Sequence, residues 1–220
     1  MSLTGRLATL ARIETTGIIA VIRADSSDEL VNVCKALADG GVETAEITMT
    51  TPGALEAITA ARKALGDRCV IGVGSVLDAE TARLAIIAGA QFVFAPTFNP
   101  SVIEMAHRYD KAVVPGAMTP TEILAAWQAG ADMVKVFPAN HFGPKYFRDI
   151  LAPMPQLKLT PTGGVDLETA ADWLKAGAVA LGVGSSLVKK ELLKNKDWPG
   201  LTKLARQFRN IVDQVRSSAS

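Results

Sequence analysis

The sequence has little cysteine, almost no excess charge and no long apolar run. Its 220 residues include two cysteines, Cys34 and Cys69, too few for the disulfide framework of a small secreted domain. Lys and Arg number 23 against 22 Asp and Glu, and a net charge of +1 gives no broad footprint for nucleic acid or acidic membrane. The longest nearly apolar segment, residues 84–96, is shorter than the roughly 20 residues that cross a bilayer. We therefore expect a cytoplasmic protein that binds a small molecule.

Hydrophobic residues, by contrast, make up 49% of the chain and charged residues 20%, which supports a sizeable core and excludes a disordered or collagen-like chain. A helical segment that ends in a glycine turn and continues into a short apolar run occurs four times. Glycine ends helices by adopting a left-handed conformation, so each copy is typical of a helix followed by a strand. The repetition predicts an α/β fold. The copies cover residues 37–48, 87–95, 128–137 and 175–183.

Eight short apolar or β-branched runs are expected to form strands, separated by segments of helical length such as Ser27–Asp39 and Thr119–Ala129. Eight strand–helix units in about 200 residues predict a TIM (β/α)8 barrel, with residues 1–220 as a single domain. An extra N-terminal helix over Leu3–Ile13 is expected to plug or flank the barrel, and Trp198–Arg216 to close the chain. An open doubly wound sheet is the alternative. The expected strands are Ile18–Arg23, Thr44–Met49, Val70–Gly74, Phe92–Ala95, Ala112–Pro115, Met133–Phe137, Leu157–Thr160 and Val179–Val183.

A lysine lies inside one of these apolar runs. Because side chains alternate along a strand, Lys135 should share one face with Met133 and Phe137 and point into the barrel. Burial disfavours the ammonium form and lowers the pKa of a lysine from about 10.4, so the amine can form a Schiff base with a carbonyl. The alternative is a lysine that a carboxylate neutralises, or one that reaches out through the barrel mouth.

A carboxylate is expected in the same interior. In the run from Glu46 to Thr50, alternation places Glu46, Thr48 and Thr50 on one face of a strand. A carboxylate beside a Schiff base could transfer the protons that imine formation and carbon–carbon cleavage require. The alternative role for Glu46 is that of a counter-ion for Lys135.

Glycine-rich segments follow the seventh and eighth expected strands, at Thr160–Val165 and Gly182–Ser186. In TIM barrels these two loops commonly bind phosphate through backbone N–H groups. Their joint occurrence favours a phosphate site over plain tight turns. Ser75, after a glycine-rich strand, could bind a carboxylate, and Arg23, at the end of the first strand, could bind a phosphate or a carboxylate.

Five motifs in a fixed order make the chain resemble the KDPG/KHG aldolases over nearly its whole length. The resemblance implies a class I aldolase that reversibly splits 2-dehydro-3-deoxy-6-phosphogluconate (KDPG) into pyruvate and glyceraldehyde 3-phosphate and often acts on 4-hydroxy-2-oxoglutarate. It also implies a homotrimer of (β/α)8 barrels that needs neither metal nor cofactor. The motifs are Glu46-Ile-Thr, Gly72-Val-Gly-Ser, Pro115-Gly-Ala-Met-Thr-Pro, Lys135-Val-Phe-Pro-Ala and Pro161-Thr-Gly-Gly-Val.

The resemblance, carried over residue by residue, places the Schiff-base lysine at Lys135 and the general acid/base at Glu46. The hydroxyl that binds the pyruvyl carboxylate falls on Ser75, where the family usually has threonine. The remaining substrate-binding positions that it implies are Arg23, Pro96, Phe137, Thr162, Gly163 and Gly164. The loop after the eighth strand adds Gly184 and Ser185.

Two departures from the family pattern bear on the substrate. The family typically has an arginine where this chain has Thr50, so a hydroxyl takes the place of a guanidinium in binding the substrate carboxylate. The family's Gly-Gly-Ser-Trp is replaced by a segment that begins at Gly182. The alternatives are therefore the same chemistry on the galactonate epimer or another 2-keto acid, or a non-catalytic barrel that binds a phosphorylated sugar acid.

Overall fold

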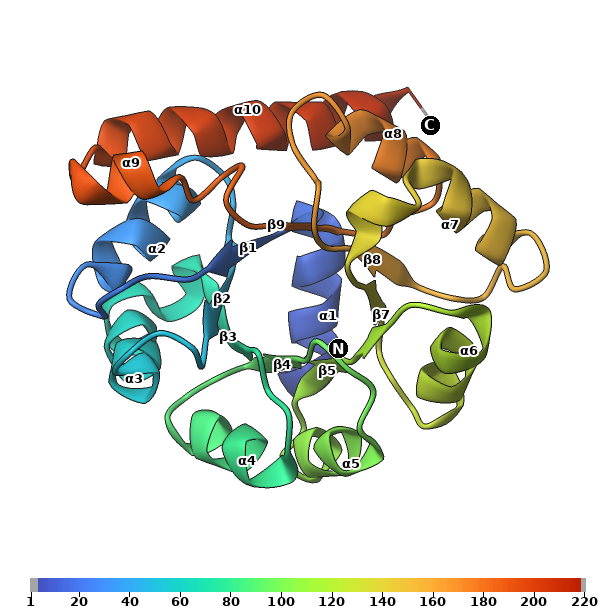
Figure 1. Cartoon of the computed structure of the whole chain (residues 1–220). Coiled ribbons are helices and arrows are strands. Elements are labelled where there is room, and N and C mark those ends of the chain that lie inside the picture. The colour runs from blue at the N-terminus through green and yellow to red at the C-terminus, as the bar shows by residue number, and fades with distance from the viewer. Residues whose placement is uncertain (1–3, 219–220) are drawn as a thin grey trace.

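Short parallel strands alternate with helices along the chain, and the strands curl into a ring with helices outside it (Figure 1). The structure is a computed structural model that describes residues 4–218. The strands are β1 (Ile18–Ile22), β2 (Thr44–Thr48), β3 (Val70–Gly74), β4 (Phe92–Phe94), β5 (Ala112–Val114), β6 (Gly116–Ala117), β7 (Val134–Val136), β8 (Leu159–Pro161) and β9 (Leu181–Val183). The helices are α1 (Gly5–Thr16), α2 (Leu30–Asp39), α3 (Ala54–Leu65), α4 (Ala79–Ile87), α5 (Pro100–Arg108), α6 (Pro120–Gln128), α7 (Pro144–Leu151), α8 (Ala170–Lys175), α9 (Lys190–Lys194) and α10 (Trp198–Ser217), with 3-10 turns at Gly66–Arg68 and Ala139–His141.

The strands form a closed parallel sheet. One part has the order β5-β4-β3-β2-β1-β9 and the other β6-β7-β8. The two parts join at Pro115, between β5 and β6, so these two strands are one barrel strand interrupted by a proline. Bridges from Leu159 to Ala178 and from Thr162 to Gly182 connect β8 to the β9 segment. The predicted TIM-barrel fold is confirmed, and the open doubly wound sheet is wrong.

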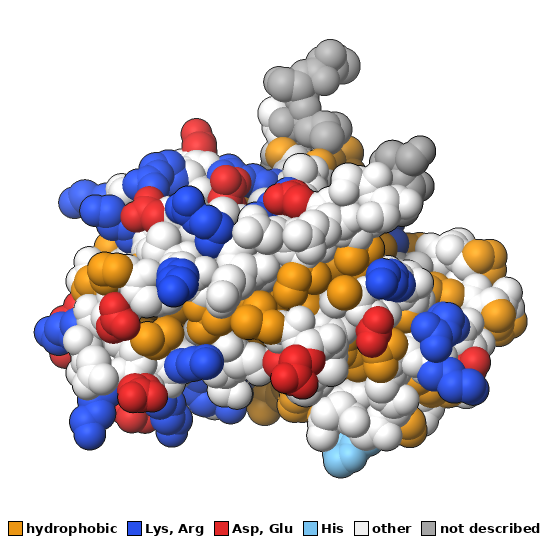
Figure 2. Space-filling model, turned by 90° about the horizontal axis from the view of Figure 1, so that it is seen from above, with side chains coloured by type: hydrophobic (Ala, Val, Ile, Leu, Met, Phe, Trp, Pro, Cys, Tyr) orange, Lys and Arg blue, Asp and Glu red, His pale blue; other side chains and the backbone are white. Residues whose placement is uncertain are grey.

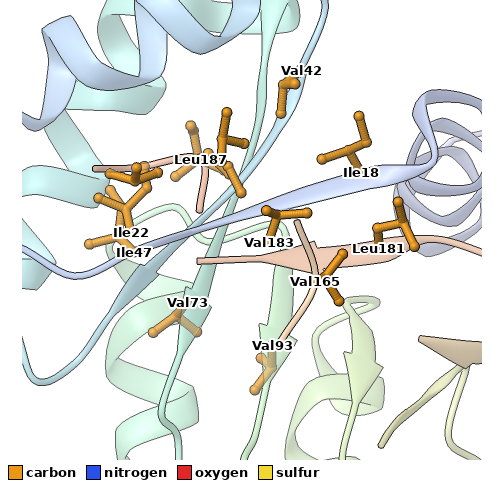
Figure 3. Packing of buried hydrophobic residues seen from close by; sticks show 14 of the residues in the cluster. Ile18, Ile22, Val42, Ile47, Val73, Val93, Val165, Leu181, Val183 and Leu187 are labelled. Atoms are coloured by element: carbon orange, nitrogen blue, oxygen red, sulfur yellow. The ribbon is translucent and has the colours of Figure 1, made fainter. Parts of the chain in front are cut away.

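The strands separate two apolar layers. Ile18, Ile47 and Val183 point outward and pack in the layer under the helices, which Figure 3 shows from close by. The alternate side chains fill the barrel, where Ile13 of α1 packs with a smaller cluster that includes Phe92. The helix α1 thus fills the end of the barrel where the strands begin, as expected for the extra N-terminal helix, although Leu3 of the predicted range lies outside the described residues.

Strand ends differ from the predicted ones by a residue or two, most at β8. The prediction began this strand at Leu157 because that residue is apolar, but its backbone N–H bonds to Met154 O in a turn while its side chain is buried. The strand begins at Leu159 and ends at Pro161. The start of α6 is as predicted, because Thr119 and Glu122 form a capping box there.

On the face shown in Figure 2, Lys and Arg side chains are interspersed with Asp and Glu, in keeping with the net charge of +1. None of the helices in residues 4–218 is long and apolar enough to span a membrane.

The barrel interior depends on a glycine in β3, which generates the first prediction. A Cβ at Gly72 would lie 2.3 Å from Cε1 of Phe92. We expect Gly72→Ala to lower the free energy of unfolding by about 1–3 kcal/mol, because the buried ring would have to shift. Urea unfolding measures this change. The control is Gly184→Ala, whose Cβ would meet Val21 Cβ at 4.0 Å; equal stability of the two variants would contradict the prediction.

Candidate active site

A cavity of about 340 Å³ opens where the strands end, on the side of the barrel opposite to α1. TIM barrels carry their active sites at this end of the strands. The cavity is lined by every predicted site residue except Thr50, namely Arg23, Glu46, Ser75, Pro96, Lys135, Phe137, Thr162, Gly163, Gly164, Gly184 and Ser185. The structure therefore brings together residues that lie up to 162 positions apart in the sequence.

Lys135 projects from β7 into this cavity and is 5% exposed. Its Nζ lies 4.5 Å from the centroid of the Phe94 ring and 4.8 Å from that of Phe137. Burial lowers the pKa of the amine, an effect that the carboxylate of Glu46 opposes and the guanidinium of Arg23 reinforces. The fraction of neutral, nucleophilic amine at neutral pH is therefore larger than for an exposed lysine.

Glu46 projects from β2 into the same space and is 1% exposed. Burial raises its pKa from an ordinary value of 4.5 to about 7, although Lys135 and Arg23 act in the opposite direction. Its Oε2 is buried and has no hydrogen-bond partner in the described part of the chain. A carboxyl group that titrates near neutral pH can both accept and donate a proton in a reaction.

Glycines make the room that these side chains occupy. A Cβ at Gly74 would lie 1.7 Å from Oε1 of Glu46, so the carboxyl group fits there because β3 presents bare backbone. A Cβ at Gly182 would similarly lie 2.2 Å from Oγ1 of Thr162. The glycine-rich strands seen in the sequence are thus what leaves the reactive groups space in a packed barrel.

Ser75 follows β3 with a φ of 59°, a left-handed conformation that is uncommon for a residue with a side chain. Such conformations persist where the surrounding structure fixes them, often at functional sites. The side chain lines the cavity, so its hydroxyl is available to a ligand there.

The glycine-rich loops after β8 and β9 form one wall of the cavity. Within residues 4–218, the backbone N–H groups of Gly164, Ser185 and Ser186 donate no hydrogen bond. Unpaired N–H groups that line a cavity are suited to an anion such as phosphate.

Thr50, which is predicted to bind the substrate, is not among the residues that line the cavity. Its side chain instead accepts a hydrogen bond from Nε of Arg23 at 3.2 Å and lies 3.0 Å from the hydroxyl of Thr48. The strand β2 ends at Thr48, so the alternation assumed for the sequence does not extend to position 50. In this chain Thr50 positions the guanidinium that does reach the cavity.

The sequence reasoning missed two charged residues at the cavity mouth, Asp25 and Lys190. Asp25 lies two residues beyond Arg23, and Lys190 begins α9 after the loop that follows β9. Their places after barrel strands are a signal that could have identified them. No group of three or more His, Cys, Asp or Glu in the described residues could hold a metal ion.

The sequence profile of the KDPG and KHG aldolases matches residues 10–204. The chain belongs to the KDPG and KHG aldolase family. This aldolase is 33% identical over 196 residues to the 2-dehydro-3-deoxy-phosphogluconate aldolase of Haemophilus influenzae, a match that covers 89% of this chain and 92% of the relative. It is 35% identical over 173 residues to the 2-dehydro-3-deoxy-6-phosphogalactonate aldolase of Escherichia coli, covering 78% and 84% of the two chains.

A solved structure extends the likeness to three dimensions. The crystal structure of KDPG aldolase from Legionella pneumophila, with pyruvate captured as a covalent carbinolamine, superimposes on this aldolase with a TM-score of 0.84. The two are 26% identical, and the match covers 90% of this chain and 96% of the other. Membership of the family makes this chain a carbon–carbon lyase, which rules out the alternative of a non-catalytic binding barrel.

The raised pKa of Glu46 predicts how the stability of this aldolase depends on pH. Between pH 4.5 and about 7 the folded chain keeps a proton that the unfolded chain has released, so this residue destabilises the fold as pH rises through that window. Glu46→Gln removes the titration. We compare the free energies of unfolding of Glu46→Gln and the natural sequence, measured with urea. The difference should shift in favour of the variant by up to about 3 kcal/mol as the pH rises from 4.5 to about 7. Exposed Glu80→Gln is the control; a constant difference for Glu46→Gln would contradict the assignment.

Proposed function

We propose that this aldolase is a class I enzyme that cleaves a 2-keto-3-deoxy-6-phospho sugar acid, with KDPG as substrate and pyruvate and glyceraldehyde 3-phosphate as products. 4-Hydroxy-2-oxoglutarate, which would yield pyruvate and glyoxylate, is a smaller substrate of the same kind. The observation that carries the proposal is the buried Lys135 amine, whose pKa is lowered, in one cavity with the carboxyl group of Glu46. Residues 1–220 are taken as one domain. The family resemblance supports a homotrimer, and the low cysteine content supports a cytoplasmic location.

The reaction begins at Lys135. Its neutral amine attacks the C2 carbonyl to give a carbinolamine, which loses water to become a protonated Schiff base. Glu46 donates the proton that the departing hydroxyl needs and becomes a carboxylate. The solved relative with pyruvate held as a carbinolamine supports this sequence of steps.

Cleavage then uses the Schiff base as an electron sink. The Glu46 carboxylate takes the proton of the C4 hydroxyl, directly or through a water, and the C3–C4 bond breaks. Its electron pair moves to C3 and into the iminium, which leaves an enamine on Lys135 and releases the aldehyde. The enamine takes a proton at C3, and water hydrolyses the resulting imine to pyruvate and free amine.

The cavity wall supplies groups for the two anionic ends of the substrate. The hydroxyl of Ser75 and the guanidinium of Arg23 are assigned to the carboxylate, with Pro96 and Phe137 enclosing the pyruvyl carbons. The assignment of the phosphate rests on the open N–H groups of the two glycine-rich loops. These loops contribute Thr162, Gly163, Gly164, Gly184 and Ser185.

The galactonate epimer is the second candidate substrate, because the Escherichia coli relative that is 35% identical is named a phosphogalactonate aldolase. Thr50 also replaces the family's arginine, which favours contacts to the substrate carboxylate that differ from those usual in the family. Both candidates have the same pyruvyl end and phosphate, so Lys135 and Glu46 act identically on them.

Release of pyruvate from purified protein, coupled to lactate dehydrogenase, tests the proposal. We expect cleavage of KDPG with the gluconate configuration, and a loss of turnover by about 10²–10⁴-fold in Glu46→Gln, because that variant keeps the shape of the side chain but transfers no proton. The assay is repeated with the galactonate epimer. A higher kcat/KM for that epimer would establish the second candidate.

Two controls complete this assay. Thr59→Val, on the exposed face of α3, should leave turnover unchanged. Circular dichroism and melting of Glu46→Gln show whether the barrel is intact, since an unpaired buried lysine destabilises a fold. Failure of the natural sequence to cleave either epimer would contradict the proposal.

A further inference from the structure

One buried hydroxyl inside the barrel has no assigned role. Thr160, in the middle of β8, is fully buried, and its Oγ1 has no hydrogen-bond partner in residues 4–218. Burying a hydroxyl without a partner is costly, so such groups are normally paired with protein or with water. The neighbouring residues of the strand, Leu159 and Pro161, do not share its face.

The sheet register places this hydroxyl next to the reactive groups. Thr160 pairs with Lys135 across β7 and β8, so the two side chains point into the barrel from adjacent strands about 4.8 Å apart. In a TIM barrel, side chains from alternate strands form layers. Lys135, Glu46 and Phe94 come from alternate barrel strands and form one layer. Thr160 comes from the strand next to that of Lys135, so it belongs to the layer beneath.

The layer that contains Thr160 is otherwise apolar. Ile19 and Val114 belong to it and pack in the inner cluster, and the ring of Phe92 fills the space over Gly72. The polar groups adjacent to Thr160 in the register come from the layer above, where Glu46 Oε2 is likewise buried and has no hydrogen-bond partner among the described residues. Together with Lys135 Nζ, these two oxygens are three polar groups in adjacent layers, and a buried water typically makes about three hydrogen bonds.

We infer that Thr160 is a positioning residue of the active site, whose hydroxyl holds a buried water between Lys135 and Glu46 and so carries a proton from one to the other. The inference rests on the proposed function. The ammonium of Lys135 gives a proton to the water, the water gives one of its own to Glu46 Oε2, and the products are a neutral amine, a carboxylic acid and the same water. Thr160 fixes the water and does not touch the substrate.

Exchange of the pyruvate methyl protons for deuterium, followed by NMR in D₂O as a function of pH, tests the inference. Exchange requires the enamine but not the sugar acid. We expect Thr160→Val, which replaces the hydroxyl with a methyl group, to exchange about 10-fold more slowly, and Thr160→Ser to stay within about twofold of the natural sequence. In Thr160→Val the acid limb of the profile should move to higher pH, because loss of the water leaves the Glu46 carboxylate less solvated. The other charged groups that line the cavity, Arg23, Asp25 and Lys190, are unchanged.

Thr44→Val is the matched control. Thr44 is also fully buried inside the barrel, but its hydroxyl lies 3.3 Å from that of Thr16 in α1, away from the cavity. This variant should lose stability and keep the exchange rate and pH profile. Thr160→Ala gives the same test if the valine variant does not fold.

The outcomes separate the two hypotheses. Exchange in Thr160→Val or Thr160→Ala at the natural rate and with the natural pH profile would overturn the role of Thr160 and leave the proposed function intact. Equal slowing in Thr44→Val would also overturn it, because the effect would then be one of barrel stability. Absence of exchange in the natural sequence would contradict the proposed function and the inference together.

Discussion

The structure is built around one costly interaction, the burial of the Lys135 amine in a barrel whose interior is largely apolar. A buried charge is expensive, and the group responds by lowering its pKa instead of by forming an ion pair. Glu46 responds to the same burial in the opposite direction, with a pKa of about 7. The pKa values of two groups that would both be charged on a protein surface are thereby shifted toward each other, as is typical of functional sites.

The rest of the barrel creates this environment. The helix α1 and the inner apolar cluster fill the barrel below the amine, while Phe94 and Phe137 place their rings beside it. Gly74 leaves the space that the Glu46 carboxyl group fills. Closure of the sheet brings β2 and β7, which are far apart in the sequence, to face one another across the interior. The geometry of the site is thus a consequence of barrel closure and of where glycine replaces a side chain.

The sequence could predict much of this, because its signals are local or periodic. Alternation of side chains along short apolar runs indicates that Lys135 and Glu46 point inward. The glycine turns that end helices indicate the repeating helix–strand unit. What could not be predicted depends on contacts between distant segments. Thr50 lies beyond the end of β2 and binds Arg23, so alternation alone misplaces it. The shared position of Asp25 and Lys190 at the cavity mouth follows from closure of the barrel, and so does the lack, among residues 4–218, of a hydrogen-bond partner for the Thr160 hydroxyl.

The proposed mechanism requires that Lys135 form a Schiff base with a keto acid. Borohydride reduction in the presence of pyruvate, followed by peptide mass mapping, tests it most directly, because reduction converts the imine to a stable secondary amine. Lys190, which also lines the cavity but is exposed, is an internal comparison. We expect the added mass on Lys135 and on no other lysine, and none when pyruvate is omitted. Label on Lys190 or another lysine, or no label at saturating pyruvate, would contradict it.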